Sequence, residues 1–241
     1  AILSSNGSFI AIGANGNELW IVKNETTYLK ISSNFCKGTL PSFSPDGNKI
    51  AFFEGRDLYT SPQYVVISYL GSEQPQTLCK KILPGTVAEL YGQPTPNWSN
   101  DNVFVYCCVV TLENIDLIYS TSFEGKYEKT WDVELVGCVE ALPSSKENVF
   151  YTVGRDGSIW LVNFNELTKR FQFISLSGGY SYNLFPILYE EKKYMLYTRF
   201  YRDELSQFNG TLEIINISDS KAKPIIIGSN VFRGFWNKYK G

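Results

Sequence analysis

Few residues of this 241-residue chain have the types that catalysis needs. The chain has no histidine, the commonest general base and metal ligand, so a Ser-His or Cys-His nucleophile pair cannot form. Its cysteines are scattered along the chain without the C-x-x-C spacing of zinc and redox motifs, and two of them are adjacent: Cys36, Cys79, Cys107, Cys108 and Cys138. The composition therefore favours a non-catalytic protein, with no metal and no cofactor.

Three acidic residues are the remaining candidates for carboxylate chemistry: Asp57, Glu89 and Asp203. A glycosidase needs two carboxylates that flank the glycosidic bond. Nothing in the spacing of these three acids singles out such a pair. Carbohydrate binding or glycoside hydrolysis stays open as the alternative function.

Aromatic and arginine side chains, the usual anchors of protein interfaces, gather in segments 54–62, 83–95, 178–183 and 199–208. We predict that all four segments are long loops on one face, where binding residues concentrate. The predicted binding residues are Arg56, Asp57, Tyr91, Tyr180, Tyr182, Arg199, Phe200, Tyr201, Arg202 and Asp203. The alternative for each residue is a structural role, in which the tyrosines fill the mouth of the channel and the Arg-Asp neighbours form local ion pairs.

Charge and hydropathy exclude two classes of partner. The 22 basic and 24 acidic residues nearly cancel, and no lysine or arginine run is present, so no nucleic acid is expected. No apolar run approaches the roughly 20 residues of a membrane helix. We therefore expect a soluble chain without a membrane span, whose most favoured partner is a protein.

A repeat unit in segment 41–53 supplies the elements that position these residues. It reads Pro-Ser-Phe-Ser-Pro-Asp-Gly-Asn-Lys-Ile-Ala-Phe-Phe, which is a short apolar strand, a turn and a second apolar strand. This order predicts a β-hairpin. Worn copies recur at intervals of about 40 to 55 residues, and the residues before the turns are Leu3, Phe43, Trp98, Leu142, Leu188 and Trp236.

A period of this length with four short strands is typical of a β-propeller. We predict one all-β domain, 1–241, made of four-stranded blades. Five blades are favoured, closed by joining the N- and C-terminal segments in one blade. Six are the alternative, in which Trp236 begins a further blade. Trp20 and Trp160 occupy equivalent strands and should be buried between blades, and Gly47 should take a positive φ.

The turn Ser44-Pro45-Asp46-Gly47, followed by Ile50-Ala51-Phe52, resembles the WD40-like repeat of the TolB-type propellers. The same repeat occurs in the non-catalytic propeller domains of the prolyl oligopeptidase group. The resemblance covers the chain through its period, and it implies a β-propeller that acts as a protein-interaction scaffold. The G-x-S-x-G elbow of the hydrolase partner domain is not in the sequence.

Cysteine usage bears on the compartment, which the sequence leaves unknown. Propellers of this kind are often exported, which slightly favours an extracytoplasmic location, whereas unpaired cysteines argue the other way. We expect the cysteines to be small buried hydrophobes, with Cys107 and Cys108 on opposite faces of one strand. A disulfide between Cys36 and Cys79 stays open.

Overall fold

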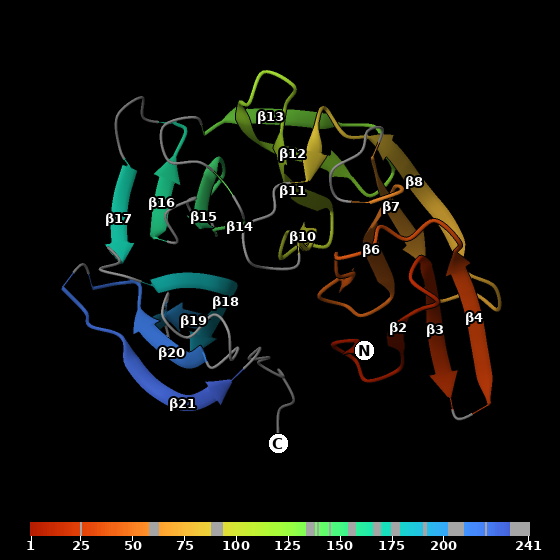
Figure 1. Cartoon of the computed structure of the whole chain (residues 1–241), viewed down its shortest axis with the longest axis horizontal. Helices are drawn as coiled ribbons and strands as arrows, with labels where there is room; N and C mark the ends of the chain where they lie inside the picture. Colours follow the sequence, from red (N-terminus) through yellow and green to blue (C-terminus); the bar gives the residue numbers. More distant parts are fainter. Residues whose placement is uncertain are drawn as a thin grey trace.

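The computed structural model describes residues 1–24, 26–57, 63–87, 94–133, 138, 140–144, 146–153, 158–165, 170–174, 179–189, 192–201, 210–219 and 221–231. Every regular element in these ranges is a β-strand, and the strands form five small antiparallel sheets around a ring (Figure 1). The structure confirms an all-β propeller of five blades. None of the described elements is a helix that could span a membrane.

Each blade is a sheet of four strands that follow one another in the sequence. Blade 1 contains β1 (Ile2–Leu3), β2 (Ile10–Ala14), β3 (Glu18–Asn24) and β4 (Thr27–Ser32). Blade 2 contains β5 (Ser42–Phe43), β6 (Lys49–Glu54), β7 (Tyr64–Tyr69) and β8 (Gln76–Ile82). Blade 3 contains β10 (Asn97–Trp98), β11 (Phe104–Val110), β12 (Asp116–Ser122) and β13 (Glu128–Asp132), and a short strand, β9 (Thr86–Val87), also pairs with β11.

The last two blades follow the same order. Blade 4 contains β14 (Glu140–Pro143), β15 (Val149–Val153), β16 (Ile159–Asn163) and β17 (Arg170–Ile174). Blade 5 contains β18 (Gly179–Tyr189), β19 (Lys192–Tyr201), β20 (Gly210–Asn216) and β21 (Ile225–Val231). The joining of the two chain ends in one blade, which we had expected, is not found among the described strands, because blades 1 and 5 are each built from one continuous segment. Trp236 lies outside the described residues.

The repeat turn has the geometry that its residues predict. Gly47 has a φ of 73°, as expected for a position that disfavours a Cβ. The Asp46 carboxylate accepts hydrogen bonds from Ser44 Oγ at 2.6 Å, the Asn48 backbone N–H at 3.0 Å and Lys49 Nζ at 3.1 Å. Burial alone would raise the pKa of Asp46, but these hydrogen bonds outweigh it and hold the pKa below its usual range.

Hydrogen bonds also connect the repeat turns of neighbouring blades. Asn6 Nδ2, in the turn of blade 1, donates to the Asp46 carbonyl of blade 2 at 3.1 Å, and Ser5 Oγ donates to the Pro45 carbonyl at 2.8 Å. The Asp46 N–H in turn donates to Asn102 Oδ1, in the turn of blade 3, at 2.9 Å. Hydrogen bonds from the side chains of these repeat turns therefore connect neighbouring blades as well as neighbouring strands.

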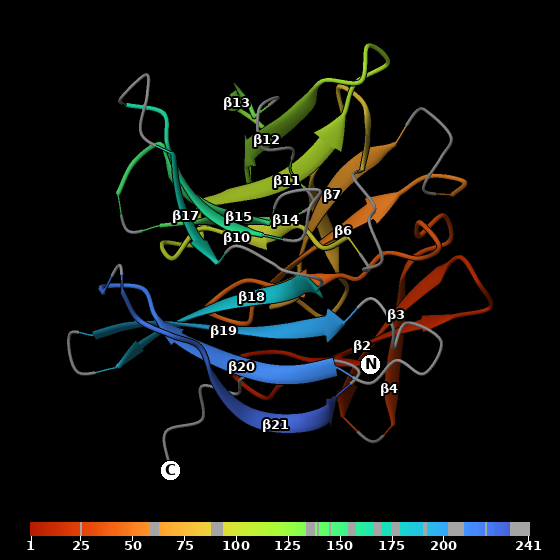
Figure 2. The same cartoon turned by 60° about the vertical axis from the view of Figure 1, so that its left-hand side comes forward.

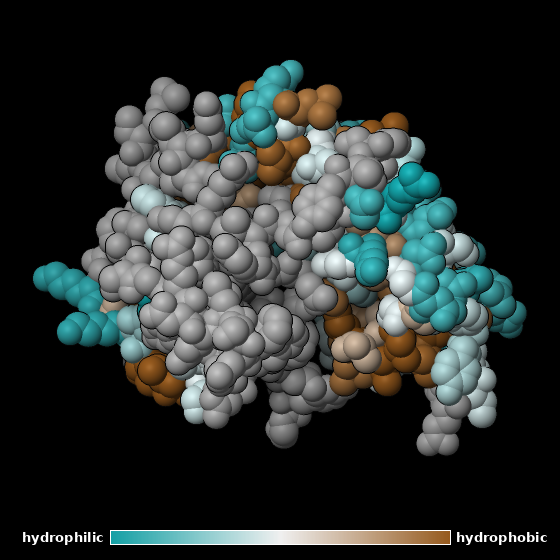
Figure 3. All heavy atoms as spheres, in the orientation of Figure 1, coloured by the Kyte–Doolittle hydropathy of each residue, from teal (hydrophilic) through white to brown (hydrophobic). Residues whose placement is uncertain are grey.

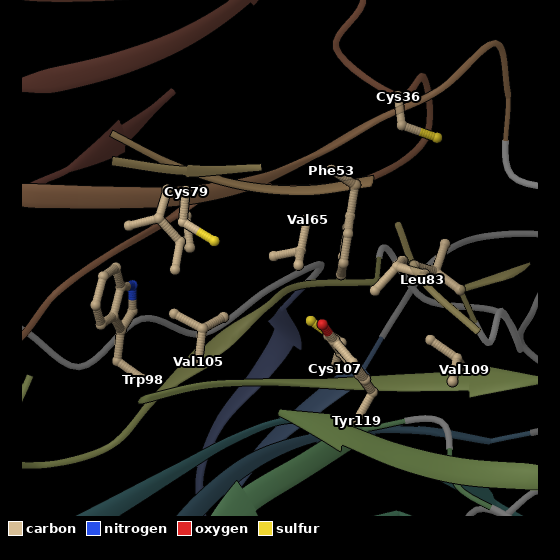
Figure 4. Close-up of a cluster of buried hydrophobic side chains, with 13 residues drawn as sticks. Cys36, Phe53, Val65, Cys79, Leu83, Trp98, Val105, Cys107, Val109 and Tyr119 are labelled. Atoms are coloured by element: carbon tan, nitrogen blue, oxygen red, sulfur yellow. The ribbon is translucent and has the colours of Figure 1, made fainter. Parts of the chain in front are cut away.

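Apolar clusters fill the interfaces between successive blades, and four are found in the described residues. In the second interface, Phe53 and Val65 of blade 2 lie opposite Val105 and Cys107 of blade 3 (Figure 4). Cys108, the neighbour of Cys107, belongs instead to the cluster between blades 3 and 4. This confirms that the two cysteines are on opposite faces of β11, and blade 3 is therefore apolar on both faces.

The seam between blades 5 and 1 differs from the other interfaces. Ile10 is 38% exposed, whereas its repeat equivalent Ile50 is fully buried between blades 1 and 2. Figure 3 shows hydrophobic surface over this part of blade 1. The described residues contain no buried cluster at this seam. Blade 1 therefore buries one of its faces much better than the other.

The two tryptophans that we expected to be buried are both half-buried. β3 buries Leu19 and Ile21 against blade 2, so Trp20, which alternates with them, lies on the face toward the seam. Its indole N–H donates to Glu18 Oε2 at 3.0 Å. The expectation of full burial was wrong for Trp20, because its face lies at the seam, where the described residues form no buried cluster. It was also wrong for Trp160, which shows the same intermediate burial.

Cys108 and Cys138, separated by 30 residues, form a disulfide between β11 and the segment that leads into blade 4. Cys36 and Cys79, the pair that the sequence left open, are not joined, and both are buried thiols together with Cys107. Burial raises the pKa of the Cys79 and Cys107 thiols, so neither is an activated nucleophile.

Gly47→Val tests the connection between repeat turns. The left-handed φ alone should cost about 1–2 kcal/mol of unfolding free energy. A Cβ at Gly47 would also lie 2.5 Å from Asn6 Cγ, so displacing Asn6 should cost about 1 kcal/mol more through its lost hydrogen bond. Gly16→Val is the matched control, because Gly16 has a φ of 82° and no atom near its Cβ position. Equal losses in urea unfolding would contradict the connection.

Thiol titration tests the disulfide assignment. Unfolded protein without reductant should titrate three thiols, and reduced protein should titrate five. Cys108→Ser should titrate four without reductant, because Cys138 is released, and should lose about 3 kcal/mol of stability since the bridge closes a long loop. Five thiols in the unreduced wild type would show that the bridge is not formed.

Candidate functional site

The predicted binding residues fall into three groups in the structure. Tyr91, Arg202 and Asp203 lie outside the described residues. Arg56 and Asp57 follow the end of β6, in a bend, as predicted. The remaining five were predicted to lie in loops and instead belong to two long strands: Tyr180 and Tyr182 to β18, and Arg199, Phe200 and Tyr201 to β19.

Strand pairing brings these five residues together at one end of blade 5. Gly179 pairs with Tyr201, Tyr180 with Phe200, and Ser181 with Arg199. β18 and β19 have 11 and 10 residues, whereas the first two strands of blade 4 have 4 and 5. The loop prediction was wrong because aromatic residues favour a paired strand, so the ladder continues beyond the length usual in the other blades (Figure 2).

Topology places Arg56 and Asp57 on the same face of the propeller as this strand end. They follow the second strand of blade 2, and Arg199, Phe200 and Tyr201 end the second strand of blade 5. The buried Gln63 fixes the base of the blade 2 bend, because its Nε2 donates to the Asp57 carbonyl at 2.6 Å and its Oε1 accepts from the Val87 N–H at 2.7 Å. We call this end of the ring the long-connection face.

A buried polar network holds Arg199 in place. Glu213 of β20 is buried, and its carboxylate accepts hydrogen bonds from Tyr197 Oη at 2.7 Å and Thr211 Oγ1 at 2.9 Å. Arg199 Nη1 lies 3.5 Å from Glu213 Oε2, and little of either side chain is exposed. A carboxylate buried in this way needs its partners, since it has lost its hydration. Arg199 therefore serves the structure of blade 5 as well as lying on the predicted surface.

The outer edge of blade 5 is chemically unlike the other blade edges. The outermost strands of blades 1 to 4 all carry charged residues, namely Lys30, Lys80, Lys81, Glu128, Lys129, Asp132 and Arg170. β21 reads Ile-Ile-Ile-Gly-Ser-Asn-Val, without a charge. Ile225, Ile226 and Ile227 are 63%, 59% and 50% exposed, and Figure 3 shows hydrophobic surface at the place of β21, at the lower left.

A cavity of about 480 Å³ lies between blades 3 and 4, on the face opposite the long connections. It opens between the repeat turns of blades 3 and 4, and its walls include Phe104, Tyr106 and Trp131. We did not predict this cavity from the sequence. The available signals were the alternation Phe104-x-Tyr106 and the loss of the Pro-Asp-Gly turn in the fourth repeat, which we treated as decay of the repeat.

Comparison with known proteins establishes the fold of this chain and does not establish its function. No family model matches the chain, and no curated protein matches it in sequence. A protein described as a TolB from Agrobacterium tumefaciens is 15% identical with a TM-score of 0.65, over 96% of this chain and 80% of that chain. TolB from Acinetobacter baumannii is 14% identical with a TM-score of 0.57, over 91% of this chain and 51% of that chain.

The β-propeller domain of the Trilobed protease from Pyrococcus furiosus also matches, at 12% identity and a TM-score of 0.45, over 88% of this chain and 65% of that chain. The likeness of the fold rests on the two TolB structures, which superpose better. The TolB-type resemblance carried by the Ser-Pro-Asp-Gly repeat is therefore confirmed for the fold. At such identities a shared fold does not transfer a function.

Proposed function

We propose that this protein is a non-catalytic β-propeller binding module, and that it docks an extended strand of a partner protein on blade 5. The observation that carries the proposal is the uncharged outer strand β21 with its three exposed isoleucines. An outermost strand presents unpaired backbone N–H and C=O groups, which is the surface that strand addition uses. Backbone hydrogen bonds would supply affinity, and the isoleucine side chains would supply apolar contact.

The contrast with the other blades supports this choice of edge. Charged side chains on outer strands oppose pairing with another chain, because pairing would desolvate the charges. Blades 1 to 4 carry such charges and β21 does not. Three consecutive exposed isoleucines are unfavourable in water unless a partner covers them, so the exposed triplet favours a protein ligand over a small polar one.

The long-connection face supplies the second part of the proposed surface. Tyr180, Tyr182, Arg199, Phe200 and Tyr201 lie on the same blade as β21, at the end where β18 and β19 extend beyond the usual strand length. Aromatic and arginine residues are the side chains that most often anchor protein interfaces. A partner that pairs with β21 and continues toward this end of blade 5 would contact both. The TolB fold is compatible with such a scaffold role and does not identify the partner.

Ile225→Lys tests docking on β21, and Ile82→Lys is its matched control. Ile82 ends the outer strand of blade 2 and is 62% exposed, against 63% for Ile225. Affinity capture with the wild type should yield a partner whose binding Ile225→Lys weakens by about tenfold or more, while Ile82→Lys leaves it unchanged. Hydrogen exchange of the complex should then show protection of the β21 amides.

Two results would contradict docking of a partner protein on β21. One is a partner that binds the Ile225→Lys variant as tightly as the wild type. The other is a concentration-dependent dimer in sedimentation that Ile225→Lys dissociates, which would assign the edge to a second copy of this chain. Neither result depends on a change in fold, because both substitutions are on exposed side chains and should alter stability by less than about 0.5 kcal/mol.

The triple variant Tyr182→Ala, Phe200→Ala, Tyr201→Ala tests the long-connection face. It should stay folded in a thermal melt and bind the same partner at least about tenfold more weakly, because interface anchors are lost. Lys126→Ala is the control, since Lys126 is exposed on the opposite face and pairs with the nearby Glu124. Unfolding of the triple variant would show that the aromatic residues are structural, and the long-connection face would then be dropped.

A further inference from the structure

The cavity between blades 3 and 4 has features that the proposed protein docking does not use. It lies on the face opposite the long connections and involves two other blades, so it is independent of β21. Its volume of about 480 Å³ falls within the usual range of small-ligand sites. Between blades 1, 2 and 3, hydrogen bonds join the corresponding turns, whereas here the two turns border the opening.

Aromatic rings form the inner wall of this cavity. Phe104 and Tyr106 are half-buried on β11, with ring centroids 6.5 Å apart. Phe150 of blade 4 packs edge-on against Tyr106 and Trp131, with ring centroids 5.2 Å and 4.9 Å away, which holds these two rings in place. Rigid aromatic faces are electron-rich, and they attract the C–H groups on the flat side of a pyranose ring.

The rim of the cavity carries two charges of each sign. Asp101 and Glu147 supply carboxylates, and Lys129 and Lys146 supply ammonium groups. Lys129 Nζ lies 5.0 Å from the Trp131 ring centroid and donates to Asn148 Oδ1 at 2.7 Å, so the cation position over this ring is already occupied by the protein. A rim without net charge favours a neutral ligand rich in hydrogen-bonding groups over an ion of either sign.

The hydroxyl of Tyr106 is a polar group of the inner wall. The pKa of Tyr106 is raised to about 12, mainly by burial and further by the charges of Asp101 and Glu147, so its hydroxyl stays protonated at neutral pH and can donate.

We propose that this cavity is a saccharide-binding site that holds one or two pyranose units of a neutral oligosaccharide. Phe104 and Tyr106 would stack against the sugar faces. The carboxylates of Asp101 and Glu147 would accept hydrogen bonds from sugar hydroxyls, and Lys146 would donate to them. No bond is broken in this proposal, because nothing in the cavity assigns distinct acid and base roles to the two carboxylates.

Titration with cellotriose, maltotriose and tri-N-acetylchitotriose, followed by saturation-transfer NMR and calorimetry, tests the site. At least one should bind saturably to the wild type. Phe104→Ala and Glu147→Gln should each weaken that binding by about tenfold, and Tyr106→Phe should weaken it less because the ring remains. Tyr127→Ala is the matched control, because Tyr127 is an exposed aromatic residue of blade 3 that does not line the cavity. Ile225→Lys should leave saccharide binding unchanged.

Three outcomes would overturn the saccharide site. The first is that none of the three trisaccharides binds saturably. The second is binding that Phe104→Ala and Glu147→Gln leave unchanged, which would place the sugar elsewhere. The third is saturable, salt-sensitive binding of a trilysine peptide in place of the sugars, which would assign the cavity to a basic peptide. If Phe104→Ala fails to fold, the exposed Glu147→Gln variant and the conservative Tyr106→Phe variant decide the question.

Discussion

The structure depends on the burial of apolar blade faces against the neighbouring blades. A four-stranded sheet with hydrophobic residues on both sides cannot exclude water from both faces by itself, so each blade requires a neighbour on either side. β11 illustrates this requirement at the level of single residues, since Cys107 packs toward blade 2 and Cys108 toward blade 4. The ring arrangement follows, because turning each blade against the next buries successive faces without leaving long exposed sheets.

Polar contacts add a second, more selective connection between blades. The Ser-Pro-Asp-Gly turn satisfies its own backbone through Ser44 and Asp46, and its remaining donors and acceptors reach the turns of the adjacent blades through Asn6 and Asn102. Asn102, with a φ of 62°, takes the left-handed position that Gly47 fills in blade 2. The fourth repeat has Lys146 and Glu147 where the Asp-Gly pair would be, and a cavity lies beside its turn.

Blade 5 departs from the other blades in two respects: its first two strands are longer, and its outer strand lacks charge. Its third strand also buries the carboxylate of Glu213. The hydrogen bonds of Glu213 connect the long second strand of blade 5 to its third strand. Arg199 and Tyr197 from β19 and Thr211 from β20 surround one acid, which ties the second and third strands together and leaves the outer strand to present its isoleucines.

Sequence alone determined the fold class, because a period of 40 to 55 residues and a turn such as Ser44-Pro45-Asp46-Gly47 are local signals that survive even where single repeats have decayed. It also determined that Cys107 and Cys108 are on opposite faces, since strand alternation is a property of the backbone. Tertiary structure decided what depends on neighbours distant in the chain. Tyr180 lies in a strand because Phe200 pairs with it. The disulfide joins Cys108 to Cys138, and Cys36 and Cys79 are not joined. Trp20 is half-buried because its face lies at the seam. The cavity beside Tyr106 is likewise formed where two blades meet, so local signals such as Phe104-x-Tyr106 do not by themselves place it.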